Sequence, residues 1–555
     1  MKWFDRRPSV RVLSGMIVAF VLVSGHPALS QFIADPNDGI YRFLDIWEQR
    51  GYFPPLPSLR PYPLQLVEEA LSKVIQNGSR AEAQTAQRFL SKYTARVIPL
   101  AVSGSVAHEY RNTNDGHLDR TIVGLETTDR VLPNCAYSVG GKLFLEEATT
   151  ANAFPVLSNT YASSVKAETG GFAFNVGLGA QEADSLSSFS VVSGSASFGT
   201  DRLYLQGGLH RTSYGPVFGS VVLGPQAPQA GHLSLTYRTS WVTYSGLFME
   251  LQAILGVKPD GTVYRLNEEL DHYPQKNLIL HSFTFHPFSW LHVGLINTVV
   301  FCDRISPIYI FPAPVHGYYA SAYLSSWDNA FVGFEADIDF PFGARLSLLL
   351  YVDDLHWQRL TVLDFDTNGN KVAGQANLSW VLPLSVPARI SAEYLMITPY
   401  MYTQDSTAVW NYLQYTQKGR SLGSALEPNS DQWTIRAFAM PYVGLQFELL
   451  YRRARHGNGS DYGEGSVDGD GSIFDDGRLP SGDITFKDRS SFLTQDVLEV
   501  VNEFTVSAEY LFEVWHIETK LGLGYSLELV KNRDLDPAAP AETNHYFSFE
   551  ASIGI

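Results

Sequence analysis

The chain has 555 residues, and its 57 acidic side chains outnumber its 40 basic ones, which gives a formal net charge of −17. This acidic balance argues against a nucleic-acid partner, because phosphate backbones are bound by basic surfaces. Charged residues make up only 17% of the chain and aromatic residues 13%, and since soluble proteins carry roughly 25% charged residues, a string of ordinary soluble domains is not expected.

Residues 1–30 are predicted to be a cleaved secretory signal peptide. Basic residues between Lys2 and Arg11 precede an apolar core at 16–23, and Ala28-Leu29-Ser30 forms a small-x-small cleavage site before Gln31. Removing the four basic residues and one acidic residue of this segment leaves 36 basic and 56 acidic residues, a net charge near −20. The remaining sequence contains no apolar stretch of about 18 residues, so a membrane-spanning helix is not predicted.

Residues 31–97 follow the spacing of helices. Apolar side chains recur every three or four residues from Ile40 to Trp47 and from Leu64 to Ile75, and glycines follow both runs. A third helix is predicted to begin at the capping box of residues 79–82, Ser-Arg-Ala-Glu. This small helical unit is expected either to cap the periplasmic mouth of a barrel or to plug its lumen.

From residue 98 onward, apolar and polar side chains alternate along extended segments. The clearest runs are 172–181, 202–210, 332–340, 516–529 and 545–555. Runs of about 10 residues are long enough for a tilted strand to cross a bilayer, whereas strands of soluble proteins cluster near about 5 to 6 residues. Because a closed barrel pairs every backbone group between its strands, residues 98–555 are predicted to form an all-β transmembrane barrel.

Short turns and long polar segments alternate between the predicted strands. The turns are expected at 199–201, 241–243, 287–289, 340–343, 382–385, 440–441 and 512–515. The long segments are expected at 214–230, 257–275, 303–326, 356–370, 400–430, 454–499 and 531–543. Short periplasmic turns opposite long outer loops are typical of outer-membrane barrels, and the pattern gives about 18 antiparallel strands. The last strand is expected to pair with the first, near Leu100 to Tyr110, which leaves no open edge.

The sequence resembles the capsule-assembly Wzi family of outer-membrane proteins. The stretches that carry this resemblance are IYRFLDIWEQRGYF, RPYPLQLVEEALSKV, LYLQGGLHRTSYGPVFGSVVLGPQAP and DNAFVGFEADIDFPFGARLSLLLYVDD. The resemblance implies a barrel that is occluded by its helices and outer loops and that binds or anchors surface polysaccharide. It also implies a polysaccharide site at the residues that match the family's pattern, namely Arg211, Tyr214, Gly215, Pro216, Asp328 and Asn329.

Other candidate sites rest on the residues alone. Glu335, Asp337 and Asp339 share one face of a strand, so they form either an acidic row that sets ion preference in a lumen or a wall paired with Arg345 or Arg238. Residues 457–477 are rich in Asp and Gly, which is compatible with a loose calcium loop or with a mobile outer loop.

No cofactor, structural metal or catalytic residue is predicted. The cluster His272, His281, His286 and His292 is divided by a strand and a turn, so a metal site is not expected. No nucleophile motif such as Gly-x-Ser-x-Gly occurs, and the protein is not expected to be an enzyme. The expected partners are outer-membrane lipid, surface polysaccharide and the barrel-assembly machinery, and the barrel is expected to be a monomer. The alternative function is a porin-like channel for small solutes.

Overall fold

The computed structural model describes most of the chain beyond the predicted signal peptide, which lies outside the described residues. The described residues are 35–94, 100–111, 116–132, 135–148, 174–176, 185–253, 256–257, 263–264, 275–302, 304, 306–312, 316, 328–354, 370–404, 413–457, 473, 492–514 and 517–554. Within these ranges, no helix has both the length and the apolar character needed to cross a membrane.

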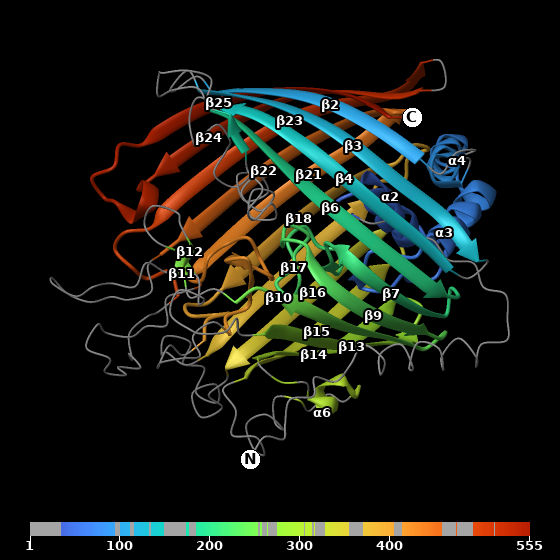
Figure 1. Cartoon of the computed structure of the whole chain (residues 1–555), viewed down its shortest axis with the longest axis horizontal. Coiled ribbons are helices and arrows are strands. Elements are labelled where there is room, and N and C mark those ends of the chain that lie inside the picture. The colour runs from blue at the N-terminus through green and yellow to red at the C-terminus, as the bar shows by residue number, and fades with distance from the viewer. Residues whose placement is uncertain are drawn as a thin grey trace, which may run out of the picture.

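The helices predicted before the barrel are present as α2 (Gly39–Gln49), α3 (Leu64–Asn77) and α4 (Arg80–Thr94). The capping box is confirmed, since Ser79 Oγ accepts from Glu82 N at 3.3 Å and Glu82 Oε2 accepts from Ser79 N at 2.9 Å. Buried residues of α2 and α3 pack together and against Val381, Phe438 and Met440 of the barrel wall. These helices therefore lie inside and across one mouth of the barrel (Figure 1).

Eighteen antiparallel strands of the described chain close into one barrel. In chain order they are β2 (Leu100–Arg111), β3 (Gly116–Leu132), β4 (Cys135–Ala148), β6 (Ser185–Gly199), β7 (Leu203–His210), β9 (Ala230–Arg238), β10 (Val242–Leu251), β13 (Lys276–Phe288), β14 (Leu291–Cys302), β15 (Asn329–Phe340), β16 (Ala344–Asp354), β17 (Lys371–Val381), β18 (Ala388–Ile397), β21 (Ser430–Tyr442), β22 (Leu445–His456), β23 (Glu499–Val514), β24 (Ile517–Lys531) and β25 (Glu542–Gly554). The predicted closure is confirmed, because β25 pairs with β2 from Ser103↔Gly554 to Arg111↔Tyr546.

The described elements also include two-residue strands, one short helix and a 3-10 turn. The minor strands are β1 (Leu59–Arg60), β8 (Ser213–Tyr214), β11 (Gly256–Val257), β12 (Val263–Tyr264), β19 (Thr416–Gln417) and β20 (Arg420–Ser421). The helix α6 (Pro307–Ile310) and the short 3-10 turn η3 (Arg533–Leu535) lie in loops between barrel strands.

Several sequence predictions need correction in position. The turn predicted at 241–243 lies at 239–241, before β10, and β23 continues to Val514, beyond the start of the turn predicted at 512–515. The predicted strand at 172–181 contributes only β5 (Phe174–Val176) to the described residues, and the wall strand beside β4 is β6. The alternation of β6 is weak in the sequence because most of its residues are Ser, Gly or Ala. The turn predicted at 440–441 lies at residues 443–444, because β21 continues through Pro441 at an irregularity of the ladder between Ala439 and Tyr442.

The period-two pattern places apolar side chains outside the barrel and mostly polar ones inside. On β15, Phe334 faces outward with 51% of its surface exposed, while its neighbour Glu335 faces inward and is buried. Exposed aromatic residues gather beside the short turns, namely Trp241, Phe288, Trp290, Phe342 and Tyr442. An apolar outer band with aromatic residues at its border is the surface that a membrane-embedded barrel presents to lipid.

Candidate functional site

The segment between β7 and β9, residues 211–229, folds into the lumen and is called the lumenal loop here. Its residues Ser213 and Tyr214 form β8, which pairs with Arg60 and Leu59 of β1 in the N-terminal segment. Gly215 has a φ of +84°, which favours glycine, and its N–H donates to Ser58 O at 2.7 Å. The loop and the N-terminal segment thus join as one small sheet within the barrel.

Tyr214 fixes this junction to the barrel wall. Its ring is only 1% exposed, and its hydroxyl lies 2.8 Å from Ser282 Oγ on β13. Glu335 of β15 accepts hydrogen bonds from Ser58 Oγ, at 3.1 Å, and from Thr284 Oγ1. Burial raises the pKa of the Tyr214 phenol well above its ordinary value, so this hydroxyl stays protonated.

Arg211 holds the returning half of the lumenal loop. Its guanidinium donates to the carbonyl oxygens of Gln226 and Ala227 at 3.2 and 3.3 Å. The middle of the loop is less enclosed: residues 216–219 are half-buried. There the Phe218 ring lies 4.1 Å below the Arg436 guanidinium, and Phe218 N donates to Glu393 Oε2 at 3.2 Å.

Asp328 and Asn329 are the other residues predicted to bind polysaccharide. Their side chains form hydrogen bonds to two different loops. The Asp328 carboxylate accepts from Tyr309 OH at 2.6 Å and pairs with Arg304. Asn329 Nδ2 donates to Thr403 O and Leu413 O, at 3.3 and 3.2 Å. The structure therefore brings Tyr214, Gly215 and Pro216 together, while Asp328 and Asn329 contact other segments.

A group of buried aromatic side chains joins the lumenal loop to a second inward segment, described at residues 398–404 and 413–429. Phe331 stacks on Tyr351 on the wall, and Tyr402 stacks on Tyr415 of that segment. The two pairs contact each other in tilted arrangements, with the Phe331 and Tyr415 ring centroids 4.8 Å apart. Tyr402 OH and Tyr415 OH donate to Val221 O and Val222 O at 2.6 and 2.7 Å, and burial raises both phenol pKa values. Sequence reasoning missed these contacts, for which the only signal was the density of Tyr in a long loop.

The acidic row is a paired wall. Arg345 donates to Asp339 at 2.6 and 2.9 Å and to Glu48 of α2 at 2.6 Å, and Ser347 donates to Asp337. The pairing with Arg345 is as predicted, whereas Arg238 instead donates to Pro55 O at 2.8 Å. These acids therefore bind the wall and the N-terminal segment of residues 35–94, which is called the plug below.

The part of the lumen wall formed by β2, β4, β24 and β25 is more open than the part that carries the acidic row. Inward-facing side chains on β2, β4 and β25 are exposed, namely Ser103, Lys142 and Ser548. Beside them, Lys520 Nζ lies 2.8 Å from Glu550 Oε1 and 3.9 Å from Glu509 Oε1, and these three side chains keep a quarter or more of their surface exposed. This polar arc is the part of the described wall that solvent reaches.

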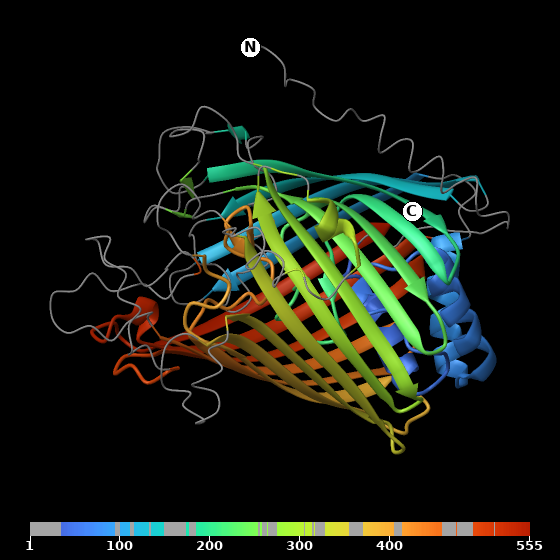
Figure 2. The ribbon, with the colours of Figure 1, turned by 90° about the horizontal axis from the view of Figure 1, so that it is seen from below.

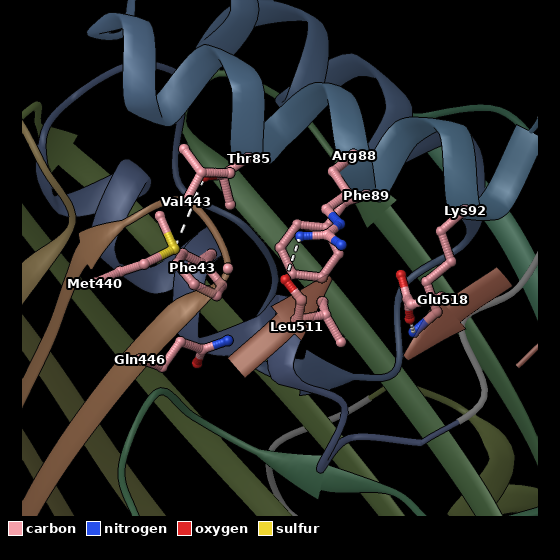
Figure 3. A pocket seen from close by; sticks show the side chains of 11 residues that line it. Phe43, Thr85, Arg88, Phe89, Lys92, Met440, Val443, Gln446, Leu511 and Glu518 are labelled. Carbon is pink, nitrogen blue, oxygen red and sulfur yellow. Dashed lines mark hydrogen bonds and ion pairs between the residues drawn. The ribbon is translucent and has the colours of Figure 1, made fainter. Parts of the chain in front are cut away.

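A small pocket marks the seam between α4 and the barrel rim (Figure 3). Its apolar floor includes Phe43, Phe89 and Met440. Arg88 donates across the seam to Leu511 O at 2.8 Å, and Lys92 Nζ lies 3.9 Å from Glu518 Oε1. The pocket is a joint between helix and wall, and Arg88 and Lys92 have partners on the rim.

The described histidines do not converge on a metal site. His286 and His292 contact each other through their Nδ1 atoms at 3.0 Å, His281 lies on the outer wall, and His272 is outside the described residues. Among the described residues, no group of three or more His, Cys, Asp or Glu side chains is arranged to hold a metal ion. The loop at 457–477 is described only at Gly457 and Ile473, so the calcium prediction falls outside the described residues.

Known proteins resemble this chain in fold and not in sequence. No protein-family model and no curated protein sequence matches it. Among solved structures it is similar to Wzi, an outer membrane protein involved in group 1 capsule assembly in Escherichia coli and described as a carbohydrate-binding β-barrel, with 12% identity, a TM-score of 0.52 and coverage of 94% of this chain and 99% of that one. It is also similar to OprD from Pseudomonas aeruginosa, with 9% identity, a TM-score of 0.41 and coverage of 82% and 93%. The likeness to Wzi, together with the closed ring of 18 strands, shows the fold of an outer-membrane β-barrel.

Proposed function

We propose that this protein is an outer-membrane barrel that binds or anchors surface polysaccharide and whose lumen is occluded. The observation that carries the proposal is the β1·β8 sheet, in which the N-terminal segment and the lumenal loop join inside the barrel and attach to β13 and β15. This joined sheet obstructs a passage for solutes, and it holds the lumenal loop in one place, as a loop that contacts a polymer requires.

The likeness to Wzi supports a carbohydrate ligand, because that protein is described as carbohydrate-binding and the likeness extends over 94% of this chain. We assign the residues of the predicted site different roles. Arg211 and Tyr214 support the loop from inside, since both are buried. Pro216 and the half-buried residues after it are the part that a sugar would contact.

We also propose how the protein reaches the membrane and in what state it acts. The chain is exported, inserted by the barrel-assembly machinery, and acts as a monomer without a cofactor. It binds polysaccharide without cleaving it, so it is not an enzyme.

Binding to the host's own surface polysaccharide tests the proposal. We expect purified barrel in detergent to retain this polysaccharide and cells to lose surface attachment when Tyr214→Ala collapses the loop's support. Tyr442→Ala, at an exposed position beside the turn between β21 and β22, is the matched control and should behave as wild type. No affinity for the host polysaccharide, together with intact attachment in Tyr214→Ala, would overturn the proposal.

The second candidate function is a channel for small solutes, and the exposed polar arc with Lys142, Glu509 and Glu550 is the observation that favours it. Planar-bilayer recording separates the two functions. An occluded barrel should be nearly silent and should open to large steady currents when residues 31–97 are deleted. Large steady currents from the full chain would instead favour the channel.

A further inference from the structure

The loop between β14 and β15 carries α6, and this helix lies against the outside of the barrel. Tyr309 of α6 is fully buried among Ile279, Val299 and Phe301. These three wall residues have the outward parity of their strands, as shown by the exposed side chains of Phe285 and Val293 on the same strands. Figures 1 and 2 both place α6 outside the ring of strands, beside β13 and β14.

The outer wall beneath this loop carries polar side chains midway along its strands, where a lipid-facing barrel wall is ordinarily apolar. Tyr244 OH lies 2.8 Å from His281 Nδ1, and both side chains face outward. The neighbouring Asn297 is 2% exposed, and its side-chain oxygen and nitrogen have no hydrogen-bond partner among the described residues. His281 is in the middle of β13, so these groups would face hydrocarbon if the loop left them.

Several backbone groups of the covering segment, residues 306–312, have local partners. Tyr309 N donates to Ser306 O at 3.1 Å, and Phe311 N donates to Ile308 O at 3.2 Å. The carbonyls of Tyr309 and Phe311 accept from His281 Nε2, at 2.7 Å, and from His316 Nε2, at 2.9 Å. Two further positions, 307 and 312, are prolines that have no N–H to satisfy. Internal pairing of backbone groups is the condition for a segment to lie in lipid.

The outer surface of the segment is apolar. Ile310 is 55% exposed and Phe311 is 62% exposed, and residues 306–312 contain no charged side chain. This surface continues the apolar band of the barrel wall. At its base the segment is fastened by Tyr309 OH to Asp328.

We propose that residues 306–312, together with His316, form a lipid-contacting flap, with Ile310 and Phe311 against acyl chains of the outer membrane leaflet and with the polar group of Tyr244, His281 and Asn297 covered by it. The outer leaflet is chosen because the flap belongs to a loop on the side opposite the short turns. This inference rests on the outer-membrane placement proposed above and is independent of polysaccharide binding.

Spin labels on single cysteines test the flap in liposomes of outer-membrane lipid. The background carries Cys135→Ser and Cys302→Ser, and the label is placed by Phe311→Cys, with Ile310→Cys as a second site. Phe334→Cys is the matched control for a lipid-facing wall position, and Ala538→Cys, in the exposed loop between β24 and β25, is the control for water. Collision with oxygen reports lipid, and collision with a water-soluble nickel chelate reports solvent.

We expect positions 311 and 310 to match 334, with an oxygen-to-nickel collision ratio severalfold higher than at 538. A ratio like that of 538 at both flap positions, with 334 still lipid-like, would overturn the flap and leave membrane insertion standing. A water-like ratio at 334 as well would overturn the membrane placement itself. Dipolar broadening between labels at 311 on two barrels would identify a second copy as the occupant and would also overturn the lipid assignment.

Discussion

Arg345 joins charged groups from distant parts of the sequence. It bridges Asp339 on the neighbouring strand and Glu48 on α2, and all three side chains are largely buried. Removing one member of a buried ionic group leaves the others uncompensated, which destabilises by about 3 to 5 kcal/mol. The plug is therefore fastened to the wall at this point by charge.

Arg345→Ala is expected to weaken the docking of α2 by about 3 kcal/mol. Amide hydrogens of α2 should then exchange on the order of a hundredfold faster, since about 1.4 kcal/mol corresponds to a factor of ten. Hydrogen exchange followed by mass spectrometry measures this. Arg202→Ala, at an exposed position in the turn before β7, is the control, and equal exchange in the two variants would contradict the prediction.

Some contacts of the acidic row could be predicted from the sequence, and others could not. The inward parity of Glu335, Asp337 and Asp339 and the pairing with Arg345 follow from the period of two and from the adjacency of two strands joined by a short turn. The ion pair between Arg345 and Glu48 could not be predicted in this way, because the two residues are 297 positions apart in the sequence and meet only when α2 docks against the wall. For the same reason the burial of Tyr214 was invisible, since a Gly-Pro turn does not say which way its loop folds.

His316 should make the docking of the flap depend on pH. Burial lowers the pKa of His316 from its ordinary value of 6.5. Two rings face His316: the His281 ring, with its centroid at 4.9 Å, and the Tyr309 ring, at 5.6 Å. His281 is in turn hydrogen-bonded to Tyr244, and Tyr309 is bonded to Asp328, which pairs with Arg304. Above pH 6.5 His316 is neutral whether the flap is docked or released, but below it the released form takes up a proton first, so docking weakens as the pH falls.

The mobility of a spin label at position 311 should therefore increase between pH 7.5 and pH 5. In His316→Gln, which keeps a donor for Phe311 O, this change should shrink, and what remains would come from His281. An identical pH response in the two proteins would assign the effect elsewhere. Greater immobilisation at low pH would reverse the sign argued here.

At the scale of elements, the helices were well predicted because their signals are local. The apolar period of α2 and α3 and the capping box of α4 involve residues within a few positions of one another. The same capping residues also attach α4 to other parts of the plug and wall: Glu82 pairs with Arg50 at 2.7 Å, and Ser79 Oγ donates to Ser385 O at 2.7 Å. Those longer contacts carry no sequence signature.

Ser79→Ala is expected to destabilise the start of α4 by about 1 kcal/mol, the usual effect of losing an N-cap side chain. Amides of the first turn of α4 should exchange roughly fivefold faster. Ser91→Ala on the same helix is the matched control, because Ser91 Oγ is exposed and bonds only within the helix, to Gln87 O. A change of equal size in both variants would mean that helix propensity, and not the cap, is responsible.

At the scale of the whole molecule, the sequence predicted the barrel, its number of strands and its closure. The alternation of side chains and the contrast between short turns and long loops repeat around the ring. The number of strands was therefore predicted correctly even though the strand beside β4 was placed at 172–181 instead of at β6. The filling of the lumen was predictable only through the family resemblance, because the lumenal loop and the segment at residues 398–404 and 413–429 look like ordinary outer loops in the sequence. Their inward direction is set by packing among Tyr402, Tyr415 and the wall.

Closure itself depends on β25, which pairs along its length with both β24 and β2. Deleting residues 542–555 would leave two facing edges with unpaired backbone groups, and each such group costs several kcal/mol in a lipid environment. Polar side chains on one face of these edges offer no substitute, because the backbone donors point along the sheet and not toward the lumen.

We therefore expect the variant lacking residues 542–555 to fail to form a compact barrel. Unboiled samples should lose the fast electrophoretic migration of folded barrels and run as the heated protein does. A deletion of equal length that begins at residue 458, between β22 and β23, is the control and should keep the folded form. If the variant without β25 migrates as folded, then β24 and β2 have paired directly, and a ring with one strand fewer is as stable as the one described.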